Sequence, residues 1–304
     1  MIEIIPFAEG QKNLDWLALI DALAAGHNGP KAEVADVFLY EGDNTLLNRS
    51  AWIAGLGVAV KCATIFPGNK ALGKPAIAGA VNLFSGKDGA LEAILDFALV
   101  TKWKTAGDSL LAARRLARPD SKNILIVGAG TVGHSLREAY GAAFPDAQFT
   151  VWNRSAAGAA ELQAAFPDMA IAEDLETAVK RADVITSATM TTEPIIKGDW
   201  LQPGQHIDLI GAYRPDMREV DDAALQRARV FVDSKETTVG HIGELKIPIA
   251  AGAFDPGDIV ADYYDLAAFS RHTTDEITLF KNGGGAHLDL MTCRYILEAW
   301  QRSD

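Results

Sequence analysis

Between residues 122 and 234, short apolar runs alternate with longer segments whose apolar residues recur at helical spacing. This alternation predicts strand–helix–strand units that share one parallel sheet, covered by helices on both faces. Pro145 and Pro167 mark the ends of two helices, and Glu173 or Asp174 can cap a third. The expected strands are Asn123–Val127, Gln148–Trp152, Met169–Ala172, Asp183–Ser187, His206–Ile210 and Val230–Asp233, and the expected helices are Val132–Phe144, Ala156–Phe166 and Leu175–Ala182.

The first 118 residues follow a different pattern, in which β-like pieces are broken by Gly, Pro and Asn. A helix over Thr105–Ala117, ended by Pro119, leads from this region into the first strand of the alternating one. We therefore expect an α/β protein with a separate α+β unit over residues 1–118 and a doubly wound parallel domain over 119–283. The other elements expected are a helix over Leu14–Ala25, β-like runs over Val37–Tyr40, Gly57–Phe66 and Ala76–Phe84, and a last helix over His287–Trp300.

The composition is that of an ordinary globular chain with an acidic balance. In 304 residues, 49% are hydrophobic and 22% charged, and the formal net charge is -12. Without a cluster of basic residues, the sequence predicts no nucleic-acid partner, and no apolar run is long enough to span a membrane. The first residues include Glu3 and Glu9, which a secretory signal would not, so we expect a cytoplasmic protein. The six histidines lack metal-ligand spacing, and we predict no metal.

A glycine-rich segment, Gly128-Ala129-Gly130-Thr131-Val132-Gly133, directly follows the first expected strand and opens a helix. In this context the first glycine permits a tight turn, the second lets a pyrophosphate approach the backbone, and the third lets helix and strand pack closely. The helix N-terminus adds unbonded N–H groups that bind phosphate. The alternative is a glycine-rich turn without a ligand. We predict a Rossmann-type dinucleotide site whose contacts include Gly128, Gly130, Thr131, Val132 and Gly133.

The end of the second expected strand favours NADP(H) over NAD(H). An NAD site usually has an acidic residue there, which binds the ribose hydroxyls, whereas this strand ends in Trp152-Asn153-Arg154-Ser155. The guanidinium of Arg154 suits a 2′-phosphate, with Asn153 and Ser155 as neutral donors. The alternative is that Ser155 only caps the next helix and Arg154 is a solvated surface residue. We also expect Thr189, after the strand that ends at Ser187, to contact the cofactor.

Candidate substrate residues lie in the first region. Lys61 interrupts an apolar β-like run, where a buried ammonium needs a carboxylate partner from the protein or from a ligand. Lys102 and Lys104 stand where the Thr105–Ala117 helix is expected to begin, and cations at a helix N-terminus make an anion site. The alternative for Lys104 is an exposed lysine at a helix start.

Several segments, taken in order, resemble the ornithine cyclodeaminase and μ-crystallin family over nearly the whole chain. They are Lys61 with Phe66-Pro67-Gly68-Asn69, Thr101-Lys102-Trp103-Lys104-Thr105-Ala106, the glycine loop, Gly211-Ala212-Tyr213-Arg214-Pro215-Asp216-Met217-Arg218-Glu219, Val232-Asp233-Ser234 with Gly243-Glu244-Leu245, and Thr278-Leu279-Phe280-Lys281 running into Gly283–Asp289. The resemblance implies a homodimer whose first domain, completed by residues 284–304, forms the dimer contact and the substrate site.

The resemblance also suggests roles for individual residues. Lys61 matches the substrate-binding lysine of the family, and Lys104 stands where most members have an arginine that grips the substrate carboxylate. Tyr213 replaces an aspartate that the cyclodeaminases use on the substrate's amino groups, which argues against cyclodeamination. Arg49 lies where many members have Met-Pro; it either supplies the guanidinium missing at Lys104 or is a surface residue of a loop.

Within the family, the segment from Gly211 to Glu219 most resembles the ketimine reductase branch, and this resemblance implies an oxidoreductase that acts on C=N bonds. The leading hypothesis is NADPH-dependent reduction of small cyclic ketimine carboxylates, Δ1-pyrroline-2-carboxylate and Δ1-piperideine-2-carboxylate, to L-proline and L-pipecolate. Lys61 and Lys104, with Arg49, would hold the carboxylate, and Lys61, Tyr213 or a bound water would protonate the nitrogen unless the iminium arrives protonated. The alternatives are an NAD⁺-dependent ornithine cyclodeaminase and a protein that binds NADPH without catalysis.

Overall fold

A computed structural model describes residues 2–302 of the chain, which form two compact units. Unit 1 contains the residues up to Lys104 and those from Gly285 onward, and unit 2 is Thr105–Gly284. Helix α3 (Phe97–Leu116) begins in unit 1 and ends in unit 2. The division therefore falls within α3, whereas the sequence placed a boundary after residue 118. Within residues 2–302, no helix combines the length and the apolar character needed to cross a membrane.

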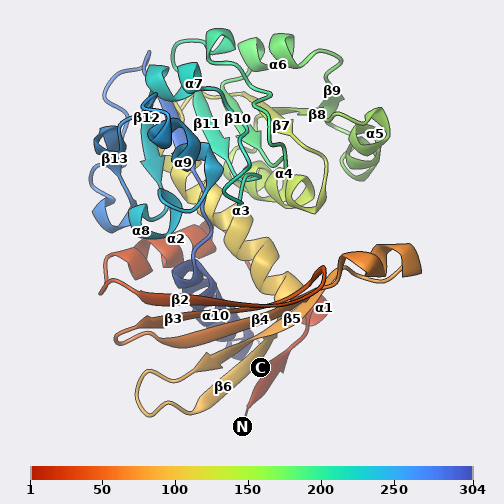
Figure 1. Ribbon diagram of the computed structural model, residues 1–304, viewed down its shortest axis with the longest axis vertical. Coiled ribbons are helices and arrows are strands. Elements are labelled where there is room, and N and C mark those ends of the chain that lie inside the picture. Colours follow the sequence, from red (N-terminus) through yellow and green to blue (C-terminus); the bar gives the residue numbers. More distant parts are fainter. Residues whose placement is uncertain (1, 303–304) are drawn as a thin grey trace. The chain divides into compact units, whose positions relative to one another are not determined.

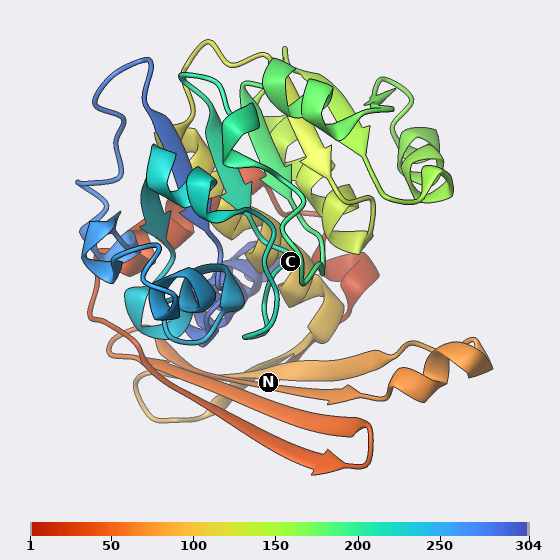
Figure 2. The same cartoon turned by 45° about the horizontal axis from the view of Figure 1, so that its top comes forward.

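Unit 2 is built on an eight-stranded sheet whose paired strands are all parallel, in the order β13-β12-β14-β11-β10-β7-β8-β9. From β7 the chain proceeds outward to β8 and β9, then returns and continues on the other side with β10 and β11. This reversal makes the sheet doubly wound, with helices on both faces (Figure 2). The strands are β7 (Asn123–Val127), β8 (Gln148–Trp152), β9 (Ala170–Ile171), β10 (Val184–Ser187), β11 (His206–Leu209), β12 (Ala228–Val232), β13 (Ile259–Ala261) and β14 (Ile277–Lys281).

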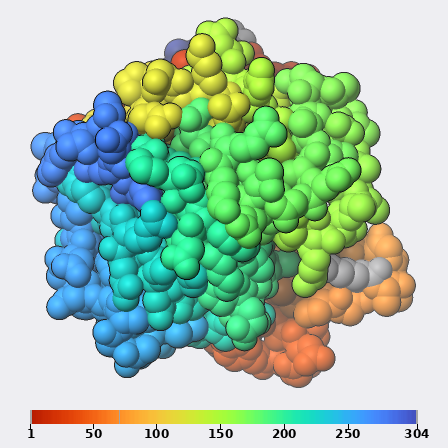
Figure 3. Space-filling model, turned by 90° about the horizontal axis from the view of Figure 1, so that it is seen from above, coloured from red at the N-terminus to blue at the C-terminus, as the bar shows by residue number. Residues whose placement is uncertain are grey.

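The helices of unit 2 start at residues whose side chains satisfy free backbone N–H groups. Ser155 accepts a hydrogen bond from the N–H of Gly158, and Asp174 accepts one from that of Thr177. Figure 3 shows part of this unit's surface, in yellow through green to blue. The helices are α4 (Thr131–Ala143), α5 (Ala156–Ala165), α6 (Leu175–Arg181), α7 (Asp222–Arg227), α8 (Lys235–Thr238) and α9 (Gly243–Ala250), with 3₁₀ turns at Gly198–Trp200, Pro256–Asp258 and Tyr263–Asp265.

The predicted α/β fold with a Rossmann-type parallel sheet is confirmed, and all six expected strands are present: two have the expected bounds, and the ends of the other four differ by at most two residues. Two strands were missed. β14 lies between β11 and β12, and β13 forms the edge beyond β12. β14 is buried at every position, so it lacks the alternation that marks a strand, and no long helix precedes it to reveal a strand–helix–strand unit.

Unit 1 contains a six-stranded sheet in the order β1-β6-β5-β4-β3-β2, in which only the β1–β6 pair is parallel. Helix α10 (Ala286–Gln301) packs on β3, β4 and α2 (Trp16–His27), and Figure 1 shows α10 against one face of this sheet. The strands are β1 (Glu3–Ile5), β2 (Glu33–Glu41), β3 (Asn44–Ile53), β4 (Gly57–Ile65), β5 (Ile77–Phe84) and β6 (Leu91–Asp96); the remaining elements are α1 (Phe7–Gly10) and the 3₁₀ segment Pro67–Leu72.

One strand of this region was missed, and the start of one helix was wrong. Residues 44–53 form β3, so Arg49 is a strand residue and not the loop residue considered as one alternative; the polar run Asn48-Arg49-Ser50 concealed the strand. The helix expected over Thr105–Ala117 begins earlier, at Phe97, where the carboxylate of Asp96 accepts a hydrogen bond from the N–H of Leu99 at 2.9 Å. Lys102 and Lys104 therefore lie inside α3, and the predicted contribution of a helix N-terminus to an anion site at these lysines is wrong.

Candidate active site

The glycine loop of unit 2 has the geometry that a dinucleotide site requires. Gly128 has a φ of 105°, and a Cβ there would lie 2.8 Å from the carbonyl oxygen of Ala188. A Cβ at Gly133 would collide with the carbonyl oxygen of Gly128, at the place where α4 packs against β7. Nothing lies within 4 Å of a Cβ placed on Gly130, which is also the N-cap of α4. Gly128 and Gly133 thus serve packing, and Gly130 leaves room for a ligand.

The loop also lies where the doubly wound sheet reverses direction. Strands β7 and β10 are neighbours, and the N–H of Ala188, just after β10, bonds to the carbonyl of Val127 at 2.8 Å. Ligands of open α/β sheets bind at the carboxyl ends of the strands beside this reversal. Thr131 and Val132 stand in the first turn of α4; Thr131 is exposed and Val132 is partly exposed.

The three residues after β8 have different surroundings. Arg154 is exposed, and no hydrogen bond or ion pair joins it to another residue of the described chain. The amide of Asn153 instead accepts a hydrogen bond from the N–H of Ala129 (3.2 Å) and donates one to the carbonyl of Ser155 (2.9 Å). Ser155 caps α5. Arg154 is therefore the residue available to a ligand, while Asn153 ties the glycine loop to β8.

Glu219 connects the loops that follow β10 and β11. Its Oε1 accepts hydrogen bonds from the Ser187 hydroxyl (2.6 Å) and from the N–H and hydroxyl of Thr189 (both 2.8 Å). Its Oε2 accepts bonds from the N–H groups of Gly211 (2.7 Å) and Ala212 (3.2 Å). The hydroxyl of Thr189 is thus engaged within the protein. Tyr213, next in the second loop, is 59% exposed.

A second buried carboxylate supports the segment that carries Glu219. Glu244, at the start of α9, accepts hydrogen bonds from the N–H groups of Glu219 (2.9 Å) and Val220 (3.0 Å). Burial raises the pKa of Glu244 above its usual value. The positive charge of Lys281 lowers this pKa, and the negative charge of Glu219 raises it further. Sequence analysis missed both acids as site residues, although both stand in segments that carried the family resemblance.

In unit 1 the sheet register aligns charged residues across three strands. Arg49 on β3 lies directly opposite Lys61 on β4 and, on its other side, opposite Asp36 on β2. The Arg49 guanidinium binds the Asp36 carboxylate through Nε (3.0 Å) and Nη2 (2.7 Å). Two cations side by side repel each other, so this row needs nearby carboxylates.

The ammonium of Lys61 is held by residues from two helices. It donates hydrogen bonds to Oδ1 of Asp289 on α10 (3.0 Å) and to the hydroxyl of Thr101 on α3 (2.9 Å), and it lies 4.6 Å from the centre of the Phe97 ring. Lys61 is only 5% exposed and Asp289 only 1%. The carboxylate that the buried lysine was predicted to need is therefore supplied by the protein itself.

Lys104 is also buried, at 5% exposure. Burial raises the pKa of Asp289, but the charges of Lys61, Lys104 and Arg49 outweigh this effect, so the net shift is downward and Asp289 is ionised at neutral pH. Burial lowers the pKa of His287, as do the neighbouring His27, Lys104 and Arg49, so His287 is neutral. The charges of Arg49, Lys61 and Lys104 thus all act on the buried carboxylate of Asp289, and Arg49 is also paired with Asp36.

The sequence matches the profile of the ornithine cyclodeaminase/mu-crystallin family over residues 50–304. The chain belongs to this family. It is 49% identical, over 97% of its length and 96% of the relative's, to a Δ1-pyrroline-2-carboxylate reductase of Paracoccus denitrificans. It is 31% identical, over 80% of its length and 76% of the relative's, to the ketimine reductase mu-crystallin of Mus musculus.

Among solved structures, this family member matches that of Thermococcus litoralis Δ1-pyrroline-2-carboxylate reductase in complex with NADH and L-proline. The TM-score is 0.89 at 25% identity, with 99% of this chain and 98% of the other covered. The family resemblance and the fold inferred from it are thus confirmed, and the names of these relatives agree with the predicted class of enzyme, an oxidoreductase.

The structure groups the predicted residues of this family member by unit. In unit 1, the charges of Lys61, Lys104 and Arg49 all lower the pKa of Asp289. In unit 2, the glycine loop, Arg154 and Thr189 stand at the carboxyl edge of the sheet. Asp289 and Thr101 were missed as site residues. The signal for Asp289 was available: a buried lysine demands a carboxylate, and Asp289 ends the last segment that carried the resemblance.

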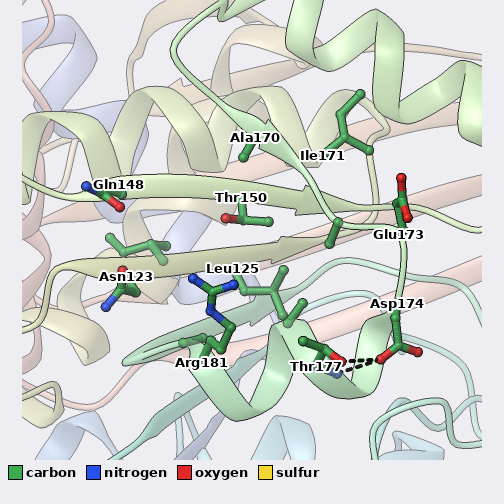
Figure 4. Close-up of a pocket in the computed structure, with 14 residues that line it drawn as sticks. Asn123, Leu125, Gln148, Thr150, Ala170, Ile171, Glu173, Asp174, Thr177 and Arg181 are labelled. Atoms are coloured by element: carbon green, nitrogen blue, oxygen red, sulfur yellow. Dashed lines mark hydrogen bonds between the residues drawn. The ribbon is translucent and has the colours of Figure 1, made fainter.

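A separate cavity of about 460 Å³ in unit 2 is lined by residues of β7, β8, β9 and α6 (Figure 4). Thr177 and Asp174 are joined by hydrogen bonds at its edge, and Arg181 lines it from α6. None of the residues predicted to bind cofactor or substrate is among the described residues that line this cavity.

Proposed function

We propose that the protein is an NADPH-dependent reductase of small cyclic ketimine carboxylates, and that it converts Δ1-pyrroline-2-carboxylate and Δ1-piperideine-2-carboxylate to L-proline and L-pipecolate. The observation that carries the proposal is the cluster of Arg49, Lys61 and Lys104 in unit 1, three cations whose charges act on one buried site and suit the carboxylate of a small substrate. The 49% identity to a Δ1-pyrroline-2-carboxylate reductase supports the same substrate class.

In this proposal the protein's own residues bind and orient the substrate. Lys61, Lys104 and Arg49 hold the carboxylate, and the burial of both lysines strengthens the attraction because few waters compete for it. A nicotinamide cofactor, when bound, supplies a hydride to the imine carbon. The reaction adds this hydride to the protonated C=N bond, so the nitrogen of the product keeps the proton and becomes a secondary amine.

The source of that proton has three candidates besides solvent delivery of the iminium: Lys61, Tyr213 and a bound water. His287 is a poor proton donor because its pKa is lowered by burial and by the surrounding cations. Tyr213 also replaces the carboxylate that cyclodeamination requires, so the reductase is favoured over an ornithine cyclodeaminase.

NADPH is proposed as the preferred cofactor because of Arg154. Its guanidinium is exposed and free of partners within the described chain, at the end of β8, where the adenosine ribose lies in Rossmann-type domains. The room above Gly130 and the N-terminus of α4 fit the pyrophosphate. A relative of known structure binds NADH, so the preference needs a direct measurement.

A homodimer is proposed from the surface of unit 1. Val37, Phe38, Leu39 and Tyr40 of the edge strand β2 are 45–73% exposed, and Trp52 on β3 is 61% exposed. An edge strand with exposed apolar side chains on neighbouring positions favours association, and a second copy of the chain is the simplest partner.

A substrate panel tests the proposed function. Purified protein is incubated with cyclic imines, linear imines formed from keto acids and amines, or ornithine, each with NADPH and with NADH. Oxidation of NADPH with the cyclic imines, with L-proline or L-pipecolate as products, is the expected result. Release of ammonia and proline from ornithine with NAD⁺ would establish the cyclodeaminase instead. Tight NADPH binding without turnover of any compound would indicate a binding protein.

A further inference from the structure

The hydrogen bonds of Lys61 to described residues use two of its three ammonium N–H groups, and the nearest ring, that of Phe97, lies 4.6 Å from Nζ. A lysine ammonium has three N–H groups and no acceptor. Among the described residues, one N–H is bonded to Asp289 at 3.0 Å and a second to Thr101 at 2.9 Å. These two partners come from different helices, α10 and α3, while Lys61 stands on β4. The backbone of Lys61 is therefore held in β4, and its ammonium is held by one residue from each of two helices.

We propose that Asp289 and Thr101 are positioning residues that fix the Lys61 ammonium so that its remaining N–H is directed at the substrate carboxylate. The inference rests on the proposed function only for the identity of this ligand. Neither residue needs to touch the substrate, since both act through Lys61.

The electrostatics of the cluster explain why Lys61 needs such support. Arg49 lies directly opposite on β3, and Lys104 on α3 acts on the same carboxylate of Asp289. Asp36 on β2 is engaged by Arg49, and His27 and His287 form a buried pair with ring centres 5.2 Å apart. Asp289 is therefore the carboxylate that offsets the repulsion of Lys61 by the other cations.

The remaining oxygen of Asp289 supports this assignment. Oδ2 is buried and makes no hydrogen bond with any residue of the described chain, so the ion pair with Lys61 is the principal bond of this carboxylate. Leaving half of a buried carboxylate without a hydrogen bond has a cost to stability. Costs of this kind are found at functional sites, and here the carboxylate would hold the Lys61 ammonium in position.

Asp289→Asn should lower kcat without raising KM for the imine. The amide is nearly the same size and keeps an acceptor, but the ion pair is lost and the cluster becomes more positive. Binding of the substrate carboxylate should therefore be kept or strengthened, with KM unchanged or lower. A misplaced ammonium should lower kcat by about tenfold or more, because misplacement of a bound group by about 1 Å can cost roughly a hundredfold. A purely structural role would instead change folding without this divergence.

Thr101 gives a second test that does not alter the charge. Thr101→Val keeps the shape and removes the hydroxyl. Since the ion pair with Asp289 remains and keeps the ammonium partly in place, kcat should fall by about threefold to tenfold, at the low end of the effect of losing one hydrogen bond to a charged group. Thr101→Ser restores the hydroxyl and should return kcat to within about twofold of the wild type. The matched control is Glu92→Gln, which removes a carboxylate bonded to Arg294 of α10 at 2.6 Å and should leave kcat and KM unchanged.

A spectroscopic measurement tests the same inference without any substrate. In ¹H–¹⁵N spectra of lysine ammonium groups, Lys61 should give a resolved signal, identified by its absence in Lys61→Arg, because a held and buried ammonium exchanges its protons slowly. The signal should broaden or vanish in Asp289→Asn and Thr101→Val and persist in Thr101→Ser and Glu92→Gln.

The outcomes separate this inference from the proposed function. If the wild-type protein reduces no imine but the Lys61 signal behaves as described, the proposed reductase function is wrong, while the positioning of Lys61 by Asp289 and Thr101 is supported. Active wild-type protein whose Asp289→Asn and Thr101→Val variants retain kcat, or retain the Lys61 signal, would overturn the positioning. A loss in Thr101→Val that serine does not restore would overturn the part assigned to Thr101.

Discussion

Replacing Arg154 by glutamine tests the proposed cofactor preference, since it removes the guanidinium that follows β8 and keeps a polar, though shorter, side chain. A hydrogen bond to a charged partner contributes about 1.5–3 kcal/mol. Arg154 is exposed, so solvent screening places the value at about 1–2 kcal/mol. At 1.4 kcal/mol per factor of ten, KM for NADPH should rise by about fivefold to thirtyfold.

The assay compares initial rates of NADPH and NADH oxidation at a saturating concentration of the cyclic imine. KM for NADH should change by less than about twofold, because NADH has no 2′-phosphate. Added salt should weaken NADPH binding more in the wild type than in the variant. Arg181→Gln is the control, since Arg181 is another exposed arginine of unit 2 but lies on α6 and lines the cavity of Figure 4. An equal rise for both cofactors, or no rise for NADPH, would refute the assignment of Arg154.

Three further predictions concern the loop, the ion pair and the core. Gly130→Ala should leave the thermal midpoint unchanged, since a Cβ there has open space. It should raise KM for NADPH and NADH alike by roughly tenfold, because the Cβ would occupy the space proposed for the pyrophosphate that both cofactors share. Lys61→Met should lower the free energy of unfolding by about 3–5 kcal/mol because it leaves Asp289 buried without its partner; adding Asp289→Leu should restore stability in urea titrations but not turnover. Burial raises the pKa of Asp208 to about 7, against hydrogen bonds from Tyr140 and Thr186. The folded protein then holds this proton while the unfolded chain loses it near pH 4, so stability should fall between about pH 4 and 7, by on the order of 4 kcal/mol. Thermal midpoints across this range should show the decline in the wild type and a flatter curve in Asp208→Asn; parallel curves would contradict it.

The parts of the fold that were predictable are those with local signals. The glycine loop, the strand before it and the helix after it are adjacent in sequence, and each residue type has a conformational reason to be there. β14 has no such signal. Its five residues are all buried, and its place between β11 and β12 depends on partners about fifty to seventy residues away. The start of α3 was misplaced because the helix was predicted from the run Thr105–Ala117, while the cap that decides it, Asp96, stands several residues earlier.

The candidate site shows the same division between local and long-range information. Lys61 was recognised because a lysine in an apolar run is anomalous by itself, and the anomaly required a carboxylate without saying which one. Its partner Asp289 is 228 positions away, and only the packing of α10 on β3 and β4 brings the two together. Arg49 became interpretable only through register, because a shift of one residue along β3 would turn its side chain to the other face of the sheet. Since the charges of the site are set by register and helix packing, substitutions in β3 or α10 that leave every charged residue in place should still alter substrate binding if they shift either element.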